Sequence, residues 1–585
     1  MRIALLIVAT LFPAVAAQTP VPRWVAVGSG PGSDVAEAIA MAPTPSSDLV
    51  AVAGTFERTL SFGAMTVESA DLPDGRSDAF LAVFSKSTGA PLWARRMGTG
   101  VFNDFGTGAA VCPDGTALVS GHFTGVATFD GGGAPDAELT TRNDFDGFLA
   151  AYTSAGDLLW VEQIGGAEQD LARRVVCDAE GGIAVVGSFA GTATWGAGAA
   201  AQTRTAAGSA DGFVAAYGSD GTLRWVTTVG GSDFDALTDA AVPLQYDTGL
   251  LVVSGTFRGA AAFGDVSLQS RGQSDAVTLR LDPADGAVLA AGQVGGSGFD
   301  YGRGIAVNSF PEGVMLAGSF ENDIVLGQTV LQSAGQSDAF FAILNTDTLG
   351  PVEGDRVGGE GVDYATDATS LLALYGDLGG ETYGVVGVLG GDASSTFEGF
   401  GTGTAVDFEG RGFDDGFAIS YFAPAPSYAY VAEVLGGANA DRAYAVAGDG
   451  DYGGAVAGTF RDVAQIGTSS VQGSEGNEVF AAYFDPGEFS PVFVADEAGP
   501  GDAGVELVVG PNPSRGRAAV ALRLAAPAAV TVDVVDALGR TVAELASGAL
   551  PAGEARWALP ALGPGVYVVR VRGEAMARRA LTVVR

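Results

Sequence analysis

Short apolar segments separated by glycine-rich turns run through most of the chain, and residues 173–229 show the pattern most clearly. Apolar residues dominate four segments there, 173–177, 183–189, 212–217 and 223–229. Turn-forming sequences such as Glu180-Gly181-Gly182 and Ser219-Asp220-Gly221 separate them. Segments of this length between such turns are typical of β-strands. We therefore expect four antiparallel strands, with residues 190–209 forming an extra hairpin at the rim.

A Gly-x-Phe tripeptide recurs at the end of one strand and shows that this pattern is a repeat. Its third residues are Phe56, Phe123, Phe189, Phe257, Phe320 and Phe460, with Leu389 of a degenerate copy in the one gap. Four antiparallel strands in each of seven consecutive repeats predict an all-β fold, a seven-bladed β-propeller of four-stranded blades. We assign residues 18–495 to it.

An aspartate stands upstream of each tripeptide, in a glycine-rich turn. These residues are Asp34, Asp104, Asp170, Asp235, Asp300, Asp363 and Asp441. A catalytic carboxylate pair would occur once, whereas a turn residue recurs with the turn. We therefore expect these side chains to accept backbone N–H bonds where each strand begins.

Tryptophan recurs near the end of the repeat and suggests how neighbouring blades pack. Trp93, Trp160 and Trp225 lie in the fourth predicted strand, just before a glycine turn, and we expect them to be wedged between adjacent blades. Trp24 lies in a similar segment that precedes the first repeat. That segment could supply the fourth strand of the last blade and close the ring, and residues 490–495 compete for the same position.

The ordered pattern of Gly-Gly-x-x-x-Asp, an apolar strand, Val-x-Gly-x-Phe, Asp-Ala-Phe and a tryptophan strand resembles the bacterial β-propeller repeats called SBBP repeats. The resemblance covers about residues 24–495, and repeats four to seven lack the tryptophan. It implies a propeller and no particular activity.

The last 81 residues follow a different pattern, after a linker of small and polar residues at 496–504. Alternating strands and turns over 505–585 predict an Ig-like β-sandwich. The sequence contains, in order, Pro511-Asn512-Pro513, Asp536 with Gly539-Arg540, and Gly565-Val566-Tyr567. This set resembles the type A C-terminal sorting domain of the type IX secretion system. Pro511 and Gly539 also have a simpler interpretation, as turn formers.

The sorting-domain resemblance implies Sec export, recognition by the type IX secretion machinery, and release or attachment at the outer surface. The N-terminus agrees, because Met1-Arg2, the apolar residues 3–12 and Ala14-Val15-Ala16-Ala17 have the order of a cleavable signal peptide, residues 1–17. No later apolar run is long enough to span a membrane. We expect a secreted or cell-surface protein, and a monomer.

Charge argues against one class of partner. The formal net charge is −38, and Lys86 is the only lysine. Such a field repels a phosphate backbone, so nucleic acid is not expected as a partner. Residues 505–585 depart from this excess with ten arginines against six acidic residues, which marks a domain boundary. Solvated turns account for the acid excess more simply than an acidic binding patch.

Few residues have the chemistry of a catalytic or metal site. His122 is the only histidine, which excludes a multi-histidine metal site, and its place inside a Gly-x-Phe tripeptide indicates a structural strand position. Cys112 and Cys177 occupy equivalent places in neighbouring repeats. An exported protein could join them in a disulfide, or both could be small buried side chains.

Two kinds of bound group have partial support in the sequence, and neither is assigned. Oxygen-rich turns such as residues 230–235 suit calcium, but none has the order of an EF-hand. Residues 87–93, which end in Trp93, resemble a segment of quinone-dependent propellers, and only three copies carry the tryptophan. The sequence therefore predicts no catalytic, cofactor-binding or metal-binding residue.

The preferred interpretation is a non-enzymatic binding or adhesion scaffold for an extracellular glycan or protein. A secreted glycan-active hydrolase with carboxylates at the propeller channel is the first alternative, and a structural envelope component without a discrete ligand is the second. A unique carboxylate pair facing the channel would favour the hydrolase. Repeated aspartates held in backbone bonds would favour the scaffold.

Overall fold

The computed structural model describes most of the chain. The described residues are 20–42, 47–70, 76–243, 249–309, 312–375, 378–390, 395–397, 406–408, 413–422, 428–449, 453–485, 492–493, 505–510, 519–524, 526–536, 541–559, 565–573 and 577–583. The predicted signal peptide and the linker at 496–504 lie outside them. Strands make up nearly all of the regular structure, and the one helical element among the described residues is the 3-10 turn Gly198–Ala200. The all-β class predicted from the sequence is confirmed.

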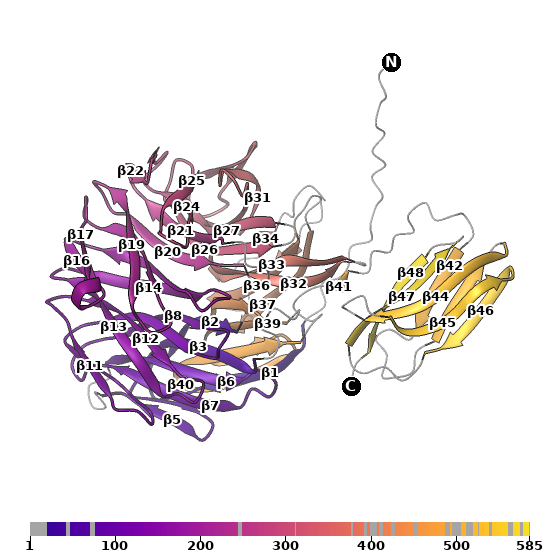
Figure 1. The fold of residues 1–585 in the computed structure, drawn as a ribbon, viewed down its shortest axis with the longest axis horizontal. Helices are drawn as coiled ribbons and strands as arrows, with labels where there is room; N and C mark the ends of the chain where they lie inside the picture. The colour runs from indigo at the N-terminus through magenta and orange to yellow at the C-terminus, as the bar shows by residue number, and fades with distance from the viewer. Residues whose placement is uncertain are drawn as a thin grey trace, which may run out of the picture.

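Four-stranded antiparallel units follow one another along the chain, one for each copy of the repeat, and we number them 1 to 7 (Figure 1). Unit 1 contains β2 (Val35–Met41), β3 (Leu49–Glu57), β6 (Ser77–Ser85) and β7 (Pro91–Gly98). Unit 2 contains β8 (Phe105–Val111), β9 (Ala117–Phe123), β12 (Asp146–Tyr152) and β13 (Leu158–Gly166). Unit 3 contains β14 (Asp170–Cys177), β15 (Ile183–Phe189), β18 (Asp211–Tyr217) and β19 (Leu223–Gly231). Unit 4 contains β20 (Ala236–Ala241), β21 (Leu251–Phe257), β24 (Asp275–Leu281) and β25 (Val288–Val294). Unit 5 contains β26 (Asp300–Ser309), β27 (Glu312–Phe320), β30 (Asp338–Leu344) and β31 (Pro351–Gly358). Unit 6 contains β32 (Tyr364–Tyr375), β33 (Leu378–Gly390), β36 (Asp414–Phe422) and β37 (Tyr428–Gly437). Unit 7 contains β38 (Arg442–Gly448), β39 (Gly454–Ile466), β40 (Ser469–Phe484) and β1 (Pro22–Gly28).

The first strands of the units contact one another in sequence, and β38 of unit 7 contacts β2 of unit 1. The first strands therefore surround a common axis as a closed ring. Unit 7 takes its fourth strand from the N-terminus, since β1 pairs with β40 in antiparallel register, Trp24 opposite Tyr483. Residues 490–495 do not compete for this place, because their described part, β41 (Val492–Phe493), pairs in parallel with β32. The N-terminal strand therefore completes the four-stranded sheet of unit 7 and closes the ring.

The tryptophans join neighbouring units. The indole Nε1–H groups donate to backbone carbonyls in a turn of the next unit, Trp24 to Lys86, Trp93 to Ser154, Trp160 to Ser219 and Trp225 to Pro283, at 2.7 to 3.0 Å. A glycine with positive φ lies under each ring: Gly89, Gly156, Gly221 and Gly286. A Cβ at these glycines would lie only 2.4 to 2.8 Å from the ring. The wedge that the tryptophan series predicted is therefore observed.

A rim hairpin extends several sheets at their outer edge. In unit 3, β16 (Thr192–Trp195) and β17 (Gln202–Thr205) form the hairpin predicted for residues 190–209. β16 pairs with β13 of the preceding unit and not with its own. The same exchange joins β10 (Val126–Phe129) to β7 and β22 (Ala260–Phe263) to β19. Neighbouring units are thus linked at the rim by backbone hydrogen bonds as well as by tryptophan.

The C-terminal residues form two antiparallel sheets. One contains β42 (Val505–Gly510), β43 (Ala519–Leu524) and β46 (Gly553–Ala558), and the other contains β45 (Thr541–Leu550), β44 (Ala528–Asp536), β47 (Gly565–Gly573) and β48 (Ala577–Val583). One core contains buried side chains of both sheets, among them Leu522, Val532 and Val569. Arg570 of β47 forms a bidentate ion pair with the buried Asp533 of β44, both contacts at 3.0 Å.

Candidate functional site

The seven first strands share a β-bulge at the third residue after the repeated aspartate. The strand register shifts across this residue in every unit. The bulged residues are Glu37, Thr107, Arg173, Thr238, Arg303, Thr366 and Tyr444, all half-buried. A bulge re-aims the side chains of its strand. Because these strands surround the axis of the ring, the bulged residues form one level of the wall of a central channel.

Three of the bulged residues are threonines with a structural role. Thr107, Thr238 and Thr366 donate their hydroxyls to the carbonyls of the next unit's first strand, at 2.7 to 2.9 Å. These bonds join units 2 to 3, 4 to 5 and 6 to 7. The other four bulged residues, Glu37, Arg173, Arg303 and Tyr444, differ from one another and from threonine. The repeat does not explain why these residue types stand at the four positions.

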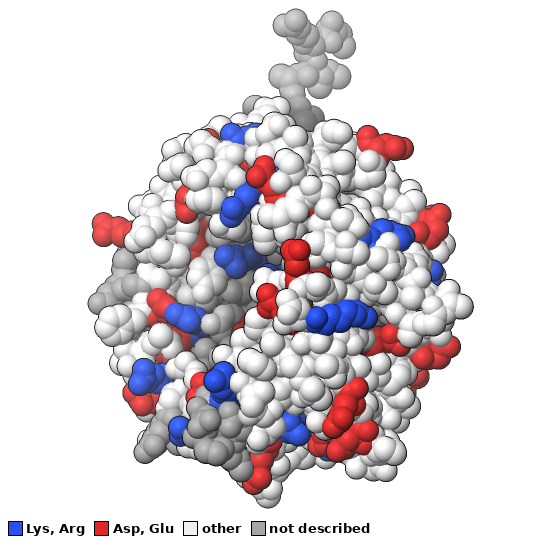
Figure 2. Space-filling model, turned by 90° about the vertical axis from the view of Figure 1, so that its left-hand side faces the viewer, with Lys and Arg blue, Asp and Glu red and all other residues white. Residues whose placement is uncertain are grey.

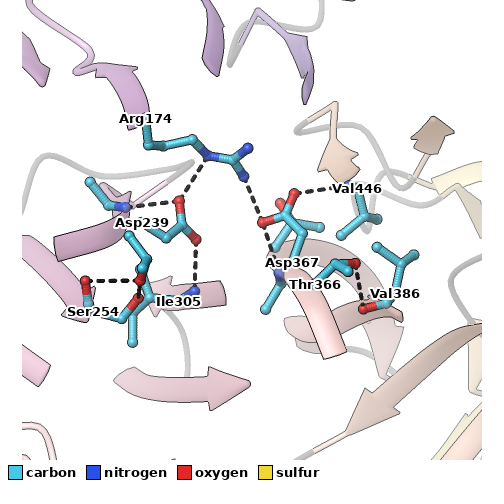
Figure 3. A network of polar contacts seen from close by, with 12 residues as sticks. Arg174, Asp239, Ser254, Ile305, Thr366, Asp367, Val386 and Val446 are labelled. Carbon is cyan, nitrogen blue, oxygen red and sulfur yellow. Dashed lines mark hydrogen bonds and ion pairs between the residues drawn. The ribbon is translucent and has the colours of Figure 1, made fainter. Parts of the chain in front are cut away.

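Arg174 forms a floor just below the bulge (Figure 3). Its Nε lies 2.8 Å from Asp239 and its terminal nitrogen 2.6 Å from Asp367, so that the side chain reaches from unit 3 to units 4 and 6. The same carboxylates accept the backbone N–H groups of Ile305 and Val446 at 2.8 and 3.0 Å. Burial alone would lower the pKa of Arg174, and the two carboxylates raise it above its ordinary value. Arg174 therefore remains charged and joins unit 3 to units 4 and 6, and the backbone bonds of the two carboxylates extend this network to units 5 and 7.

Beyond this floor lies a small apolar chamber. Its volume is about 130 Å³, and its wall includes Ile39, Val175, Ile305 and Val446, with Arg174 at one side. The disulfide between Cys112 and Cys177 joins the ends of the first strands of units 2 and 3 near this level, with a Cα–Cα distance of 5.3 Å. The bulged residues and the residues before them line the opposite end of the channel, which we call the channel mouth.

An aromatic and arginine ladder forms one side of the channel mouth. It consists, in spatial order, of Phe234, Arg258, Phe299, Tyr301, Arg303 and Tyr364. The Cζ of Arg258 lies 5.7 Å from the ring centre of Phe234 and 5.5 Å from that of Phe299. Phe299 stacks on Tyr301 at 6.2 Å, and the Cζ of Arg303 lies 5.5 and 5.0 Å from the rings of Tyr301 and Tyr364. Guanidinium groups held between ring faces are attracted by the ring quadrupoles.

Arg173 and Arg303 have little compensation for their charge. Their Nε atoms are buried and have no hydrogen-bond partner among the described residues. Burial lowers the pKa of Arg173, and the nearby Arg303 lowers it further. Burial also raises the pKa of Glu37, which Arg173 lowers in part. Tyr364 and Tyr444 interact electrostatically with Glu37 as well, so these groups form one cluster at the channel mouth.

The repeated aspartates are occupied by backbone bonds, as predicted. Asp104 accepts the N–H groups of Thr99 and Thr124 at 2.6 and 3.1 Å, and Asp235 accepts those of Gly231 and Arg258 at 2.6 and 3.1 Å. Corresponding bonds hold Asp34, Asp170, Asp300, Asp363 and Asp441. Burial raises the pKa of Asp104 to about 7. The same carboxylates recur because the same turn recurs.

His122 is packed among aromatic rings. It stacks on Phe105 at 4.8 Å and meets Phe145 edge-on at 5.3 Å. Burial, with a smaller effect of Arg173, lowers its pKa to about 3. The imidazole is therefore neutral at physiological pH. Its packing agrees with the structural strand position expected from the sequence.

The described residues contain no group of three or more His, Cys, Asp or Glu side chains able to hold a metal ion. The turn at 230–235, which the sequence suggested for calcium, directs Asp235 to backbone N–H groups. Among the same residues no helix is long and apolar enough to cross a membrane. Of the sorting motif, Asp536 ends β44, and Gly565 and Tyr567 lie in β47, whereas Pro511, Asn512, Pro513, Gly539 and Arg540 fall outside the described residues.

The apolar pattern of the sequence does not reveal the channel mouth. The signal was present at the third residue after each repeated aspartate, where Thr107, Thr238 and Thr366 alternate with unlike residues. Strict strand alternation would place Arg173 and Arg174 on opposite faces of β14. The bulge at Arg173 directs both toward the axis, and a bulge is not visible in the apolar pattern.

No family model and no curated protein matches the chain. Among solved structures, a europium-containing methanol dehydrogenase aligns with 75% of this chain and 87% of its own, at 10% identity and a TM-score of 0.29. The quinohemoprotein alcohol dehydrogenase ADHIIG from Pseudomonas putida HK5 aligns with 85% of this chain and 81% of its own, at 9% identity and a TM-score of 0.33. Likenesses this weak carry no information on activity.

Proposed function

We propose that this protein is an exported binding scaffold, a seven-bladed β-propeller that takes up its ligand at the channel mouth. The observation that carries the proposal is the contrast within one level of the channel wall. Three bulged residues are threonines bonded to the next unit, and the other four, Glu37, Arg173, Arg303 and Tyr444, are chemically diverse. Structural repetition explains the first group, and ligand recognition explains the second.

The turns around the channel mouth support this choice of face. Large apolar side chains next to the repeated aspartates are exposed: Phe102 by 42%, Phe234 by 38% and Val362 by 45%, with Phe413 of a neighbouring turn exposed by 71%. Exposed aromatic and aliphatic groups beside arginines are typical of binding surfaces. On the face shown in Figure 2, acidic and basic side chains are interspersed among uncharged residues.

The hydrolase alternative requires a free pair of carboxylates. Asp239 and Asp367 are a non-repeated pair at the channel, but both are buried and bonded to Arg174 and to backbone N–H groups. Glu37 is a single carboxylate without a carboxylate partner in its cluster. Two-carboxylate glycoside hydrolysis needs an acid and a base or nucleophile on opposite sides of one bond. This geometry favours binding over hydrolysis.

Retention on an array of glycans, soluble polymers and extracellular proteins tests the binding function. The full chain, with and without calcium, is expected to bind a restricted set of ligands, and the expected partner is an extracellular glycan or protein. Turnover of a polysaccharide without retained binding would overturn the proposal in favour of the hydrolase.

We assign delivery to the C-terminal module, as a type IX sorting domain with an Ig-like sandwich. Its two sheets around one core support such a sandwich, and the ordered motifs at 511–513, 536–540 and 565–567 support the sorting role. In a host with the type IX machinery, the chain without residues 505–585 should accumulate in the periplasm. Normal surface delivery of that truncation would refute the assignment.

A further inference from the structure

We infer that the channel mouth binds an anionic sugar, with the carboxylate or sulfate group on Arg173 and Arg303. This inference rests on the proposed binding function and names its ligand class. Arginine is suited to the task because its planar guanidinium donates several N–H bonds to one oxyanion.

The charge of the cluster indicates an anion. Arg173 and Arg303 come from the first strands of units 3 and 5, at the same bulged position, and the charge of Arg303 lowers the pKa of Arg173. The ion pairs among the described residues do not include either arginine, and both Nε atoms lack a hydrogen-bond partner there. Two like charges in a partly desolvated site destabilise each other, and an oxyanion between them would relieve that repulsion.

Arg303 is also pre-organised. Its guanidinium is held between Tyr301 and Tyr364, at 5.5 and 5.0 Å from the ring centres. Fixing a long side chain before binding reduces the entropy that association costs. The two rings restrict the positions open to the guanidinium before a ligand binds.

The other members of the cluster indicate a sugar. Glu37 is half-buried, its pKa is raised by burial, and no hydrogen bond from a described residue reaches it. A carboxyl group in this setting suits a hydroxyl of the ligand. Tyr364 and Tyr444 add phenolic groups next to Glu37. An acidic sugar combines the required oxyanion and hydroxyls on one small ring.

The size of the ligand is limited by the floor and by the net charge. Arg174 with Asp239 and Asp367 spans the channel, so a ligand enters from the mouth alone. A net charge of −38 repels a long polyanion over the whole surface. The site therefore suits a single acidic sugar or the end of a chain.

Calorimetric titration of the full chain with galacturonate, galactose 6-sulfate and galactose tests the inference. At least one of the two anionic sugars should bind, and galactose should bind about tenfold or more weakly, as expected for the loss of a charge-assisted hydrogen bond. Preference for galacturonate would identify the anion as a carboxylate, and preference for galactose 6-sulfate as a sulfate. Equal binding of all three sugars would overturn the inference.

Three variants locate the site. Arg303→Gln should weaken the anionic sugar by about tenfold to a hundredfold, and Arg224→Gln, at an exposed arginine of β19, should change nothing. Glu37→Gln removes the one acidic side chain of the cluster, and at a pH where this carboxyl is ionised the variant should bind inorganic sulfate more strongly. Thermal unfolding of each variant shows whether it is folded. Weaker sulfate binding in Glu37→Gln would overturn the inference.

The array separates this inference from the proposed function. If the chain retains other ligands and Arg303→Gln has no effect on them, the binding function stands and the anionic sugar site is wrong. If neither the sugars nor the array shows binding, the proposed function fails as well.

Discussion

The indole of Trp225 donates a 3.0 Å hydrogen bond to the carbonyl of Pro283, across the boundary between units 3 and 4. Its ring also covers Gly286, where a Cβ would approach it to 2.4 Å. The contact thus joins the fourth strand of one unit to a turn of the next. Three further tryptophans make the corresponding contact, so this relationship carries much of the adhesion between these units.

Removal of the Trp225 indole should therefore destabilise the contact between units 3 and 4. Trp225→Ala is expected to lower the free energy of unfolding by about 3–5 kcal/mol, the usual cost of deleting a buried large aromatic side chain. Leu289→Ala is the matched control, because Leu289 lies on the fourth strand of the next unit with 54% of its surface exposed. Urea unfolding of both variants, monitored by far-UV circular dichroism and not by tryptophan fluorescence, measures the two losses. A similar loss in the control would contradict the assigned role.

Arg174 gives a second prediction, because it is the ion-pair partner of two buried carboxylates. Arg174→Met should destabilise the chain by about 3–5 kcal/mol, since removal of one partner leaves uncompensated buried charge. Adding Asp239→Asn and Asp367→Asn to Arg174→Met should recover most of that loss. The comparison of single and triple variants by denaturant unfolding tests this. Absence of recovery would mean that Arg174 acts mainly through its packing.

The repeated aspartates predict an unusual dependence of stability on pH. Burial raises the pKa of Asp34 to about 8 and that of Asp170 and Asp300 to about 7, from ordinary values near 3.8. A carboxyl whose pKa is raised on folding contributes stability that is fully present below about 3.8 and is lost as the pH rises through about 7 to 8. The melting temperature should therefore be higher at pH 5 than at pH 8.

The net charge of −38 acts in the same direction, because repulsion grows as carboxyls ionise. Melting scans at pH 5 and pH 8, repeated in 0.5 M sodium chloride, separate the two effects. Salt screens the repulsion between exposed charges. The difference that remains in salt is the part that the buried aspartates supply, and its absence would contradict their raised pKa values.

His122 offers a direct spectroscopic test with the opposite sign. Its pKa is lowered on folding to about 3 from 6.5, so its contribution to stability is present above pH 6.5 and is lost as the pH falls toward 3. Because the chain has one histidine, a histidine-labelled sample gives a single imidazole signal. That signal should keep its neutral-form chemical shift from pH 7.5 to pH 4.5. A midpoint near pH 6.5 in the folded protein would show that the ring is solvated.

These predictions differ in how much of their basis the sequence contained. The tryptophan wedge and the aspartate turns repeat, so their roles followed from the spacing of Trp93, Trp160 and Trp225 and from seven similar turns. The closure by Trp24 was one of two alternatives, and strand pairing decided it. A repeat predicts only the roles that its copies share, so it gives no role to Glu37 and Arg303, which each occur in unlike company at the bulged position. Their common level depends on a bulge, and only backbone register reveals it.

The disulfide gives the last prediction. Cys112 and Cys177 are 65 residues apart in sequence and join the first strands of units 2 and 3. A crosslink of this span restricts the unfolded chain and should contribute about 4 kcal/mol in the chain-entropy model. The double variant Cys112→Ala, Cys177→Ala should unfold at a lower urea concentration by a corresponding amount. Reductant should lower the midpoint of the parent chain toward that of the double variant and leave the double variant unchanged. Thiol titration shows whether the reductant has broken the bond. If it has, and the parent chain still unfolds at the same urea concentration, the bond adds no stability.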